Sequence, residues 1–315
     1  MSLYPDRPHT TGAPHVTLAP TSALSALAVD APSGSRRRLV MVMALATTLA
    51  EIGSVAGWLP LIPIADLRIP LSFLPALGLA AVCGERLLGR SASRRRAAVY
   101  WTAIGSALTV TAAIYLREGH MTLWVGLVGA SANEELVYRL AIPAVIAAIL
   151  RLGRVRLDIA RITSLALAGL WFVLLPGHRE QMGSVAGALP FVAFAALAAF
   201  VVYRSGSILP MAAGHAVSNL LTFLMWRDAA TTDARSMGLA FVLCLLVLAY
   251  GRPRRITVGD NGGLLDTRTG LEVAVIDLRD GQPASVTLTD GRTILVEGDL
   301  ANAEAVPART VASSS

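Results

Sequence analysis

The sequence predicts an all-α polytopic membrane protein of about eight transmembrane helices, with a small β-rich C-terminal extension. Apolar residues make up 54% of the 315 residues and charged residues only 15%, which is too little polar surface to cover a soluble globule of this size. Eight apolar segments follow one another along the chain, and arginines gather in every second connection between them. Together these three observations define the fold class.

The N-terminal residues, 1–35, are rich in Pro, Ser, Thr and Ala. They lack the charged start and short apolar core of a signal peptide. A stretch of this composition cannot bury enough apolar surface to fold. We therefore expect a disordered tail before the first apolar segment.

The apolar segments are long enough, or nearly so, to cross a hydrocarbon core of about 30 Å at about 1.5 Å per helical residue. They are approximately Leu39–Leu61, Ile69–Cys83, Ala97–Leu116, Met121–Leu150, Ile162–Pro176, Val185–Tyr203, Ser207–Trp226 and Met237–Tyr250. The second and fifth are short. We expect their ends to be re-entrant or tilted, which is common where a helix lines a polar cavity.

Arginine supplies all 27 basic residues, and its distribution orients the segments. Sixteen arginines flank the segments on one side and five on the other, and the bias alternates without a break. The positive-inside rule then predicts a multi-pass protein of the plasma membrane with both termini in the cytoplasm. The net charge of +6 is explained by loops beside anionic lipid, so nucleic-acid binding is not predicted.

After Tyr250 the sequence changes to short alternating runs separated by Asp280-Gly281 and Asp290-Gly291, which are strong hairpin signals. We expect a small cytoplasmic β-meander followed by a flexible end. The predicted organisation is a disordered tail at 1–35, an eight-helix membrane domain at 36–251, a β-meander at 252–300 and a flexible tail at 301–315.

Few polar side chains interrupt the apolar segments. They are Glu51, Glu134, Glu135, Arg139, His178, His215 and Asn219. A charge near the middle of a bilayer costs about 2.5–3.5 kcal/mol on insertion scales. We therefore expect these residues to have partners within the bundle, a function, or both.

Glu135 and Arg139 are one helical turn apart and can form an ion pair, which by itself could be purely structural. Glu134 points about 100° away from Glu135 on a helix. The pair would keep Glu135 charged and leave Glu134 for chemistry. Asn133 and Tyr138 are the nearest side chains that could hydrogen-bond to Glu134.

His215 and Asn219 also lie one turn apart, and His178 follows Pro176-Gly177, where a helix should break. Each residue alone could be a satisfied buried group. Found together with the glutamate pair, they favour a site. Glu51 lies midway along the first segment. The sequence leaves three roles open for it: a reactive group, a partner of an arginine, or a proton-linked group.

The pattern Glu134-Glu135-x-x-x-Arg139, followed by His215-x-x-x-Asn219 in an eight-helix chain, resembles the CPBP family of intramembrane proteases. This family includes the CAAX prenyl proteases and the Abi-like proteins of bacteriocin processing or immunity. The likeness covers roughly residues 40–250. The family's middle motif, Phe-x-x-x-His, is altered here, because Leu174 stands four residues before His178 and Phe172 six before it. We expect Leu174 to fill the place of the family's phenylalanine.

The resemblance implies an endopeptidase in which Glu134 and His178 activate water, while His215 and Asn219 stabilise the oxyanion. Glu135 and Arg139 complete that catalytic set. Peptide hydrolysis in a membrane needs a water, a base and an oxyanion donor, and these residue types supply them. The expected substrate is a membrane-associated peptide or protein.

No cofactor is expected to be required. Zinc is the alternative, because Glu134, His178 and His215 are a sufficient ligand set for a catalytic zinc ion.

Two other classes of protein fit the same residues. A non-proteolytic membrane adaptor or bacteriocin-immunity protein would use the polar cluster for packing alone, and would tolerate loss of Glu134. A proton-coupled carrier would use Glu51 and Glu134 as relay sites, with uptake that depends on a pH gradient and without cleavage.

Overall fold

The computed structural model describes residues 34–64, 67–89, 91 and 94–251, together with short strands between 256 and 306. The helices are α2 (Gly34–Val55), α3 (Phe73–Cys83), α4 (Arg94–Arg117), α5 (Met121–Leu136), α6 (Ile142–Leu152), α7 (Leu157–Val173), α8 (Pro176–Met182), α9 (Val185–Ser205), α10 (Ile208–Trp226) and α11 (Thr232–Tyr250). A 3₁₀ turn, η1 (Gly84–Leu88), and a π-helical turn, η2 (Val137–Ala141), complete the helical part. The predicted N-terminal tail up to residue 33 lies outside the described residues.

A helix lies in each of the eight apolar segments. By length and composition, five helices of the described part can cross a membrane, namely α2, α4, α9, α10 and α11. The apolar helices α3 and α7 are shorter. These features support a multi-pass helical membrane protein, whereas eight full spans are not confirmed.

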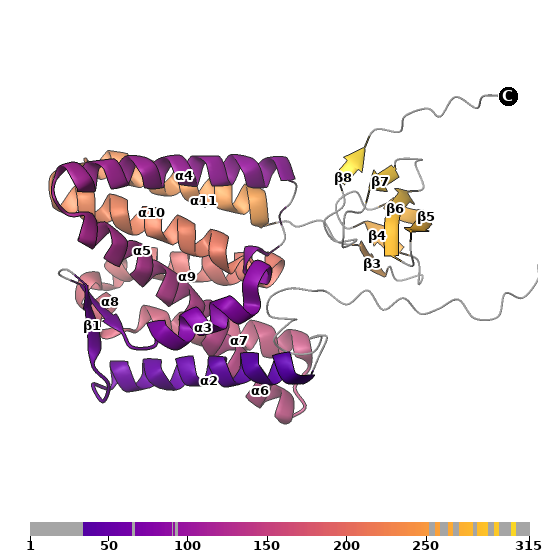
Figure 1. The fold of residues 1–315 in the computed structure, drawn as a ribbon, viewed down its shortest axis with the longest axis horizontal. Coiled ribbons are helices and arrows are strands. Elements are labelled where there is room, and N and C mark those ends of the chain that lie inside the picture. Colours follow the sequence, from indigo (N-terminus) through magenta and orange to yellow (C-terminus); the bar gives the residue numbers. More distant parts are fainter. Residues whose placement is uncertain are drawn as a thin grey trace, which may run out of the picture.

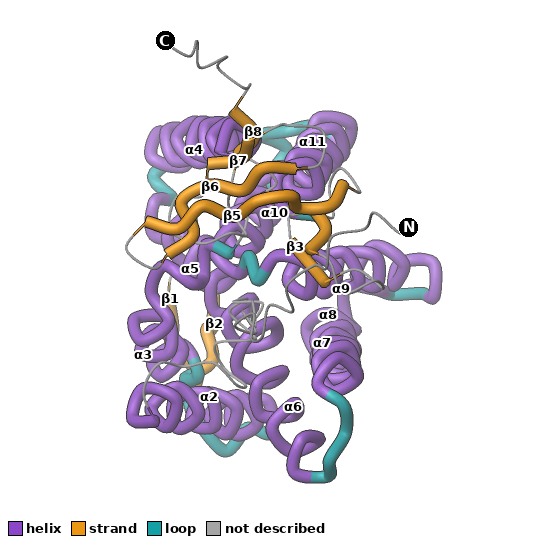
Figure 2. The backbone as a smooth tube through the Cα atoms, turned by 90° about the vertical axis from the view of Figure 1, so that its right-hand side faces the viewer, coloured by secondary structure: helices purple, strands orange, loops and turns teal. Residues whose placement is uncertain are grey.

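The helices lie in layers (Figure 1). Helices α4, α10 and α11 pack together on one side, and α2 packs on α3 on the other. Between them, α5 packs on α10, and α7 packs on α6 and α9. Figure 2 shows several of these helices, among them α2 and α4, nearly end-on. Helices α5 and α10 and the π turn η2 carry most of the polar side chains that the sequence singled out.

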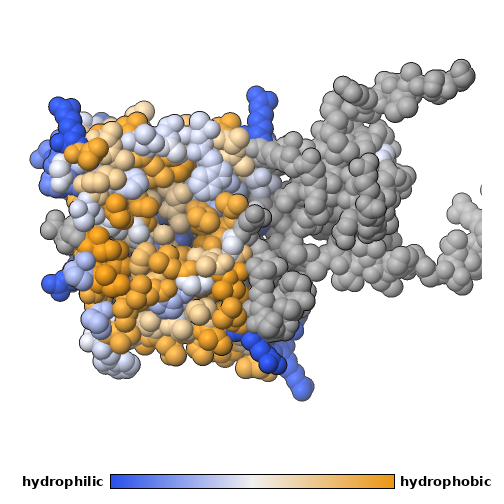
Figure 3. Space-filling model, viewed as in Figure 1, coloured by the Kyte–Doolittle hydropathy of each residue, from blue (hydrophilic) through white to orange (hydrophobic). Residues whose placement is uncertain are grey.

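Apolar side chains cover much of the outside of the helical part. Leu49 is 57% exposed, Val110 58% and Leu189 65%. In Figure 3 the hydrophobic surface lies over the middle of the helices, and the most hydrophilic side chains lie at their two ends. Such an apolar surface is suited to contact with lipid rather than with water.

The connection between the first two apolar segments is a β-hairpin, which the sequence analysis did not predict. Strand β1 (Leu61–Ile64) pairs antiparallel with β2 (Leu67–Pro70). The second segment is therefore a helix only from Phe73 onward. The hairpin lies against α5, where a Cβ atom on Gly126 would come within 2.9 Å of Leu67. Prolines within both strands oppose helix formation here.

The fourth segment runs from α5 through η2 into α6. Within η2 the regular ladder widens, because the N–H of Ile142 bonds to the carbonyl of Val137, five residues earlier. Pro143 has no N–H and its ring crowds the carbonyl four residues before it, which accounts for an interruption at this point. Single π turns of this kind often occur at functional sites.

Beyond Gly251 the structure describes antiparallel strands: β3 (Ile256–Val258), β4 (Leu264–Asp266), β5 (Leu271–Arg279), β6 (Gln282–Leu288), β7 (Thr293–Leu295) and β8 (Glu304–Val306). They pair in chain order. Both predicted Asp-Gly turns lie outside the described residues. A β-meander as a separate unit therefore stays a prediction.

Candidate active site

The six site residues predicted from the sequence come from three parts of the bundle. Glu134 and Glu135 end α5, and Arg139 lies in the π turn that follows. His178 is on the short helix α8, and His215 and Asn219 are on α10. Close packing of α10 requires a small residue beside His215, since a Cβ atom on Gly214 would lie 3.0 Å from the Tyr100 hydroxyl.

The imidazole of His215 lies between the two glutamates. Its Nδ1 is 2.9 Å from Oε1 of Glu135, and its Nε2 is 3.6 Å from Oε2 of Glu134. A carboxylate only accepts hydrogen bonds, so Nδ1 is the donor. Glu135 is 1% exposed, whereas Glu134 is 26% exposed. Only Glu134 is therefore open to an incoming water or substrate.

Arg139 is fully buried and pairs with Glu135, as predicted. Its Nε lies 3.7 Å from Oε2 of Glu135, and one terminal nitrogen donates to the carbonyl of Tyr138 at 3.3 Å. The guanidinium carbon lies 5.1 Å from the centre of the Phe172 ring, in cation–π contact. Glu135 is thus held between Arg139 and His215 on both of its oxygens.

His178 is half-buried and held by its backbone and ring contacts. Its Nδ1 donates to the carbonyl of Phe172 at 2.7 Å, because a carbonyl can only accept. The ring packs edge-on against Phe172, with centroids 4.5 Å apart, and lies tilted against Phe191, with centroids 5.1 Å apart. In a neutral imidazole this leaves Nε2 free to accept a proton. His178 also lies near Glu134.

The expectation that Leu174 replaces the family's phenylalanine was wrong. Leu174 is 53% exposed, while Phe172 is 2% exposed and contacts His178 at 4.5 Å and His215 at 6.2 Å between ring centres. The reason is the helix break. Helix α7 ends one residue after Phe172 and α8 starts at Pro176, so the extra residues lengthen the spacing from four to six.

Asn219 reaches α5 rather than the glutamates. Its Nδ2 donates to the hydroxyl of Ser131 at 3.0 Å. An amide nitrogen carries two hydrogens, so a second donor is left. Ser131 was missed by the sequence analysis, although it lies one turn before Glu135 and the spacing could have indicated it.

Asn133 and Tyr138 could have hydrogen-bonded to Glu134, but their side chains bond to Ser72 and Glu51 instead. The amide of Asn133 donates to Ser72 at 3.4 Å, and the Tyr138 hydroxyl donates to Glu51 at 2.6 Å. Glu51 pairs with hydroxyl groups, and none of its hydrogen bonds within the described part of the chain comes from an arginine.

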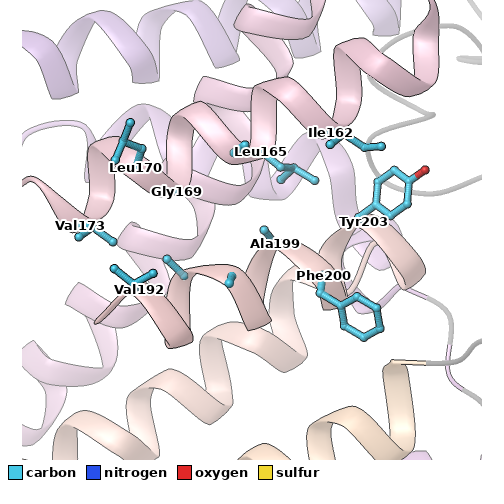
Figure 4. Close-up of a pocket in the computed structure, with 12 residues that line it drawn as sticks. Ile162, Leu165, Gly169, Leu170, Val173, Val192, Ala199, Phe200 and Tyr203 are labelled. Atoms are coloured by element: carbon cyan, nitrogen blue, oxygen red, sulfur yellow. The ribbon is translucent and has the colours of Figure 1, made fainter. Parts of the chain in front are cut away.

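An apolar groove of about 470 Å³ runs between α7 and α9 (Figure 4). Its walls extend from Ile162 and Tyr203 at one end to Val173 and Val192 at the other. None of the six site residues lines it. One of its lining residues, Val173, directly follows Phe172 in the chain.

Metal coordination was tested against the same residues. Within residues 34–64, 67–89, 91 and 94–251 and the described strands, no group of three or more His, Cys, Asp or Glu side chains has a spacing suited to a metal ion. The zinc alternative stays a prediction, which chelation can test.

The fold and this site together define a multi-pass helical membrane protein that buries a glutamate, histidine and arginine cluster. Residues 116–221 match the family model described as type II CAAX prenyl endopeptidase Rce1-like. The matched segment is about a third of the chain and contains all six predicted site residues, whereas Glu51 lies outside it. This match supports the resemblance to the CPBP/CAAX protease family that the motifs predicted. Neither a curated protein nor a solved structure matches the chain.

Proposed function

We propose that the protein is an intramembrane endopeptidase of the CPBP type, which hydrolyses a peptide bond near the membrane surface. The observation that carries this proposal is the unequal treatment of the two adjacent acids. Glu135 is sealed by Arg139 and His215, while Glu134 stays partly open beside His215. Base-activated hydrolysis needs a carboxylate that is partly accessible and lies next to imidazoles, and Glu134 fits this description.

In the proposed reaction Glu134 and His178 hold a water molecule between them, and Glu134 takes a proton from it. The water oxygen adds to the scissile carbonyl carbon. In its protonated form His215 donates from both ring nitrogens, so the oxyanion accepts one hydrogen bond from Nε2 of His215 and another from the second N–H of Asn219. When the C–N bond breaks, the proton passes from Glu134 to the leaving amine.

The substrate class follows from the family and the site's depth. CAAX prenyl endopeptidases act on membrane-associated chains, and Glu134 lies within the apolar segment Met121–Leu150. We propose a membrane-associated peptide or protein as substrate, with the bilayer as the medium that brings it to the site.

The test is cleavage of a library of membrane-tethered peptides by the purified protein, with and without a strong chelator. We expect cleavage at defined bonds in both conditions, because the favoured mechanism uses no metal. Activity lost to chelator and restored by zinc would instead establish the zinc form. Absence of cleavage across the whole library would contradict the endopeptidase proposal and favour the adaptor.

The arginine bias supports a plasma-membrane protein with cytoplasmic termini. Single cysteines at Gly153 and Ser184 test this in a background that lacks Cys83 and Cys244. Gly183 is unsuitable, because its φ of +57° strains any other residue. We expect an impermeant maleimide to label Ser184→Cys in intact cells and to label Gly153→Cys only after permeabilisation. The reverse pattern would invert the topology.

A further inference from the structure

Glu51 on α2 is a buried carboxylate that the proposed reaction does not use. It is 2% exposed. Its Oε1 accepts from the hydroxyl of Tyr138 and its Oε2 from the hydroxyl of Ser72, both at 2.6 Å. These lengths are normal for hydroxyl groups that donate to a carboxyl oxygen. Both oxygens of Glu51 are therefore occupied by fixed donors.

The same cluster reaches the reactive helix a second time. The hydroxyl of Ser72 accepts from the amide of Asn133 at 3.4 Å. Asn133 directly precedes Glu134, and Tyr138 follows it by four residues. Glu51 thus binds the α5–η2 stretch on both sides of Glu134, directly through Tyr138 and through Ser72 to Asn133.

A regular α-helix would not present the side chains of Asn133 and Tyr138 to the same cluster. Residues five apart, as Asn133 and Tyr138 are, point about 140° away from each other at 3.6 residues per turn. Their convergence on the Glu51 cluster coincides with the π turn at Val137–Ala141, where hydrogen bonds close on the fifth residue. The cluster is therefore suited to hold the widened turn in place.

The ring of Tyr138 continues the connection toward the histidines. It packs edge-on against Phe172, with centroids 5.5 Å apart, and against Trp171 at 6.0 Å. Phe172 in turn contacts His178 at 4.5 Å and also contacts His215. The hydroxyl bond to Glu51 therefore orients the Tyr138 ring, which packs against the Phe172 ring that contacts both imidazoles.

We infer that Glu51 is a positioning residue, which holds Glu134 and the two imidazoles in their reactive arrangement through Tyr138, Ser72 and Asn133. This inference rests on the proposed function. A proton-relay role fits the geometry less well, because a relay needs an oxygen open to water or to another acid, and both oxygens of Glu51 are bonded to hydroxyl groups.

The test removes single hydroxyl groups and measures kcat and KM on a membrane-tethered peptide that the wild-type protein cleaves. Tyr138→Phe and Ser72→Ala should each lower kcat about tenfold, the size expected for one hydrogen bond to a charged group, with KM unchanged within about twofold. Glu51→Gln keeps one acceptor oxygen, so it should retain more activity than Glu51→Ala. Combining Glu51→Gln with Tyr138→Phe should cost less than the product of the two single effects.

Two matched variants serve as controls. Tyr250→Phe removes a buried tyrosine hydroxyl that accepts from Trp101 between α11 and α4. Thr48→Val removes a hydroxyl on α2 itself, which bonds within the helix to Ala44. Both should keep the wild-type kcat. A general loss of packing would affect the controls as much as the cluster, and that result would overturn a specific positioning role.

Hydrogen exchange of peptides covering residues 127–141 gives a readout that does not depend on cleavage. Tyr138→Phe and Ser72→Ala should accelerate exchange in this stretch, and Tyr250→Phe should not. Unchanged exchange in the cluster variants overturns the inference whether or not the protein cleaves peptides. If the wild-type protein cleaves no peptide but the cluster variants still exchange faster, the structural role of Glu51 stands and only the proposed function is overturned.

Discussion

Glu134→Gln is expected to lower kcat by about 10²–10⁴, the range for loss of an acid–base group, in a protein that stays folded. The amide has nearly the shape of the carboxylate but cannot take a proton from water at neutral pH. In the wild-type protein, Oε2 of Glu134 lies 3.6 Å from Nε2 of His215 at a partly open site, so little of the fold depends on this contact. Single-turnover cleavage and thermal unfolding of the purified variant measure the two effects separately.

The neighbouring acid is the control for this result. Glu135→Gln should also lower the free energy of unfolding, by about 3–5 kcal/mol, because it leaves the buried guanidinium of Arg139 without its carboxylate. Full activity in folded Glu134→Gln protein would contradict the hydrolase altogether. The non-proteolytic adaptor would then be the better account.

His178→Ala is expected to reduce kcat by about 10²–10⁴ as well. Its imidazole is oriented by the bond from Nδ1 to the carbonyl of Phe172, which leaves Nε2 available, and it lies near Glu134. A histidine that merely lay at the polar boundary would change kcat less than about threefold when removed, far below the acid–base range. Initial rates on the same peptide as for Glu134→Gln give the comparison.

His120 provides the matched control for His178. It precedes α5 and accepts a hydrogen bond from Arg227 at an exposed position. His120→Ala should therefore keep the wild-type kcat. An inactive His120→Ala together with an active His178→Ala would show that the second catalytic imidazole is His120, in the connection between α4 and α5.

Much of the helical scaffold could be predicted because long apolar runs and arginine-rich connections are local properties of the chain. The hairpin between Leu61 and Pro70 was missed, since a search for apolar length reads such residues as helix. The π turn was also missed. It depends on where Pro143 meets the packing of α5 on α10, and hydropathy does not record either.

The sequence by itself determined the pairs that lie one turn apart. Glu135 with Arg139 was predictable, because residues four apart share a helix face whatever surrounds them. The residue types at Glu134, His178, His215 and Asn219 likewise indicated the chemistry, through their cost in an apolar segment and their resemblance to a protease family.

Only the tertiary structure decided which residues meet across helices. The placement of Phe172 rather than Leu174 beneath His178 depends on the residue at which α7 ends. The bond of His215 to Glu135 depends on how closely α10 approaches α5, and the bonds from Glu51 to Tyr138 and Ser72 depend on the approach of α2. Such distances are set by the packing of many side chains between helices far apart in the chain, so no local pattern of residues could have specified them.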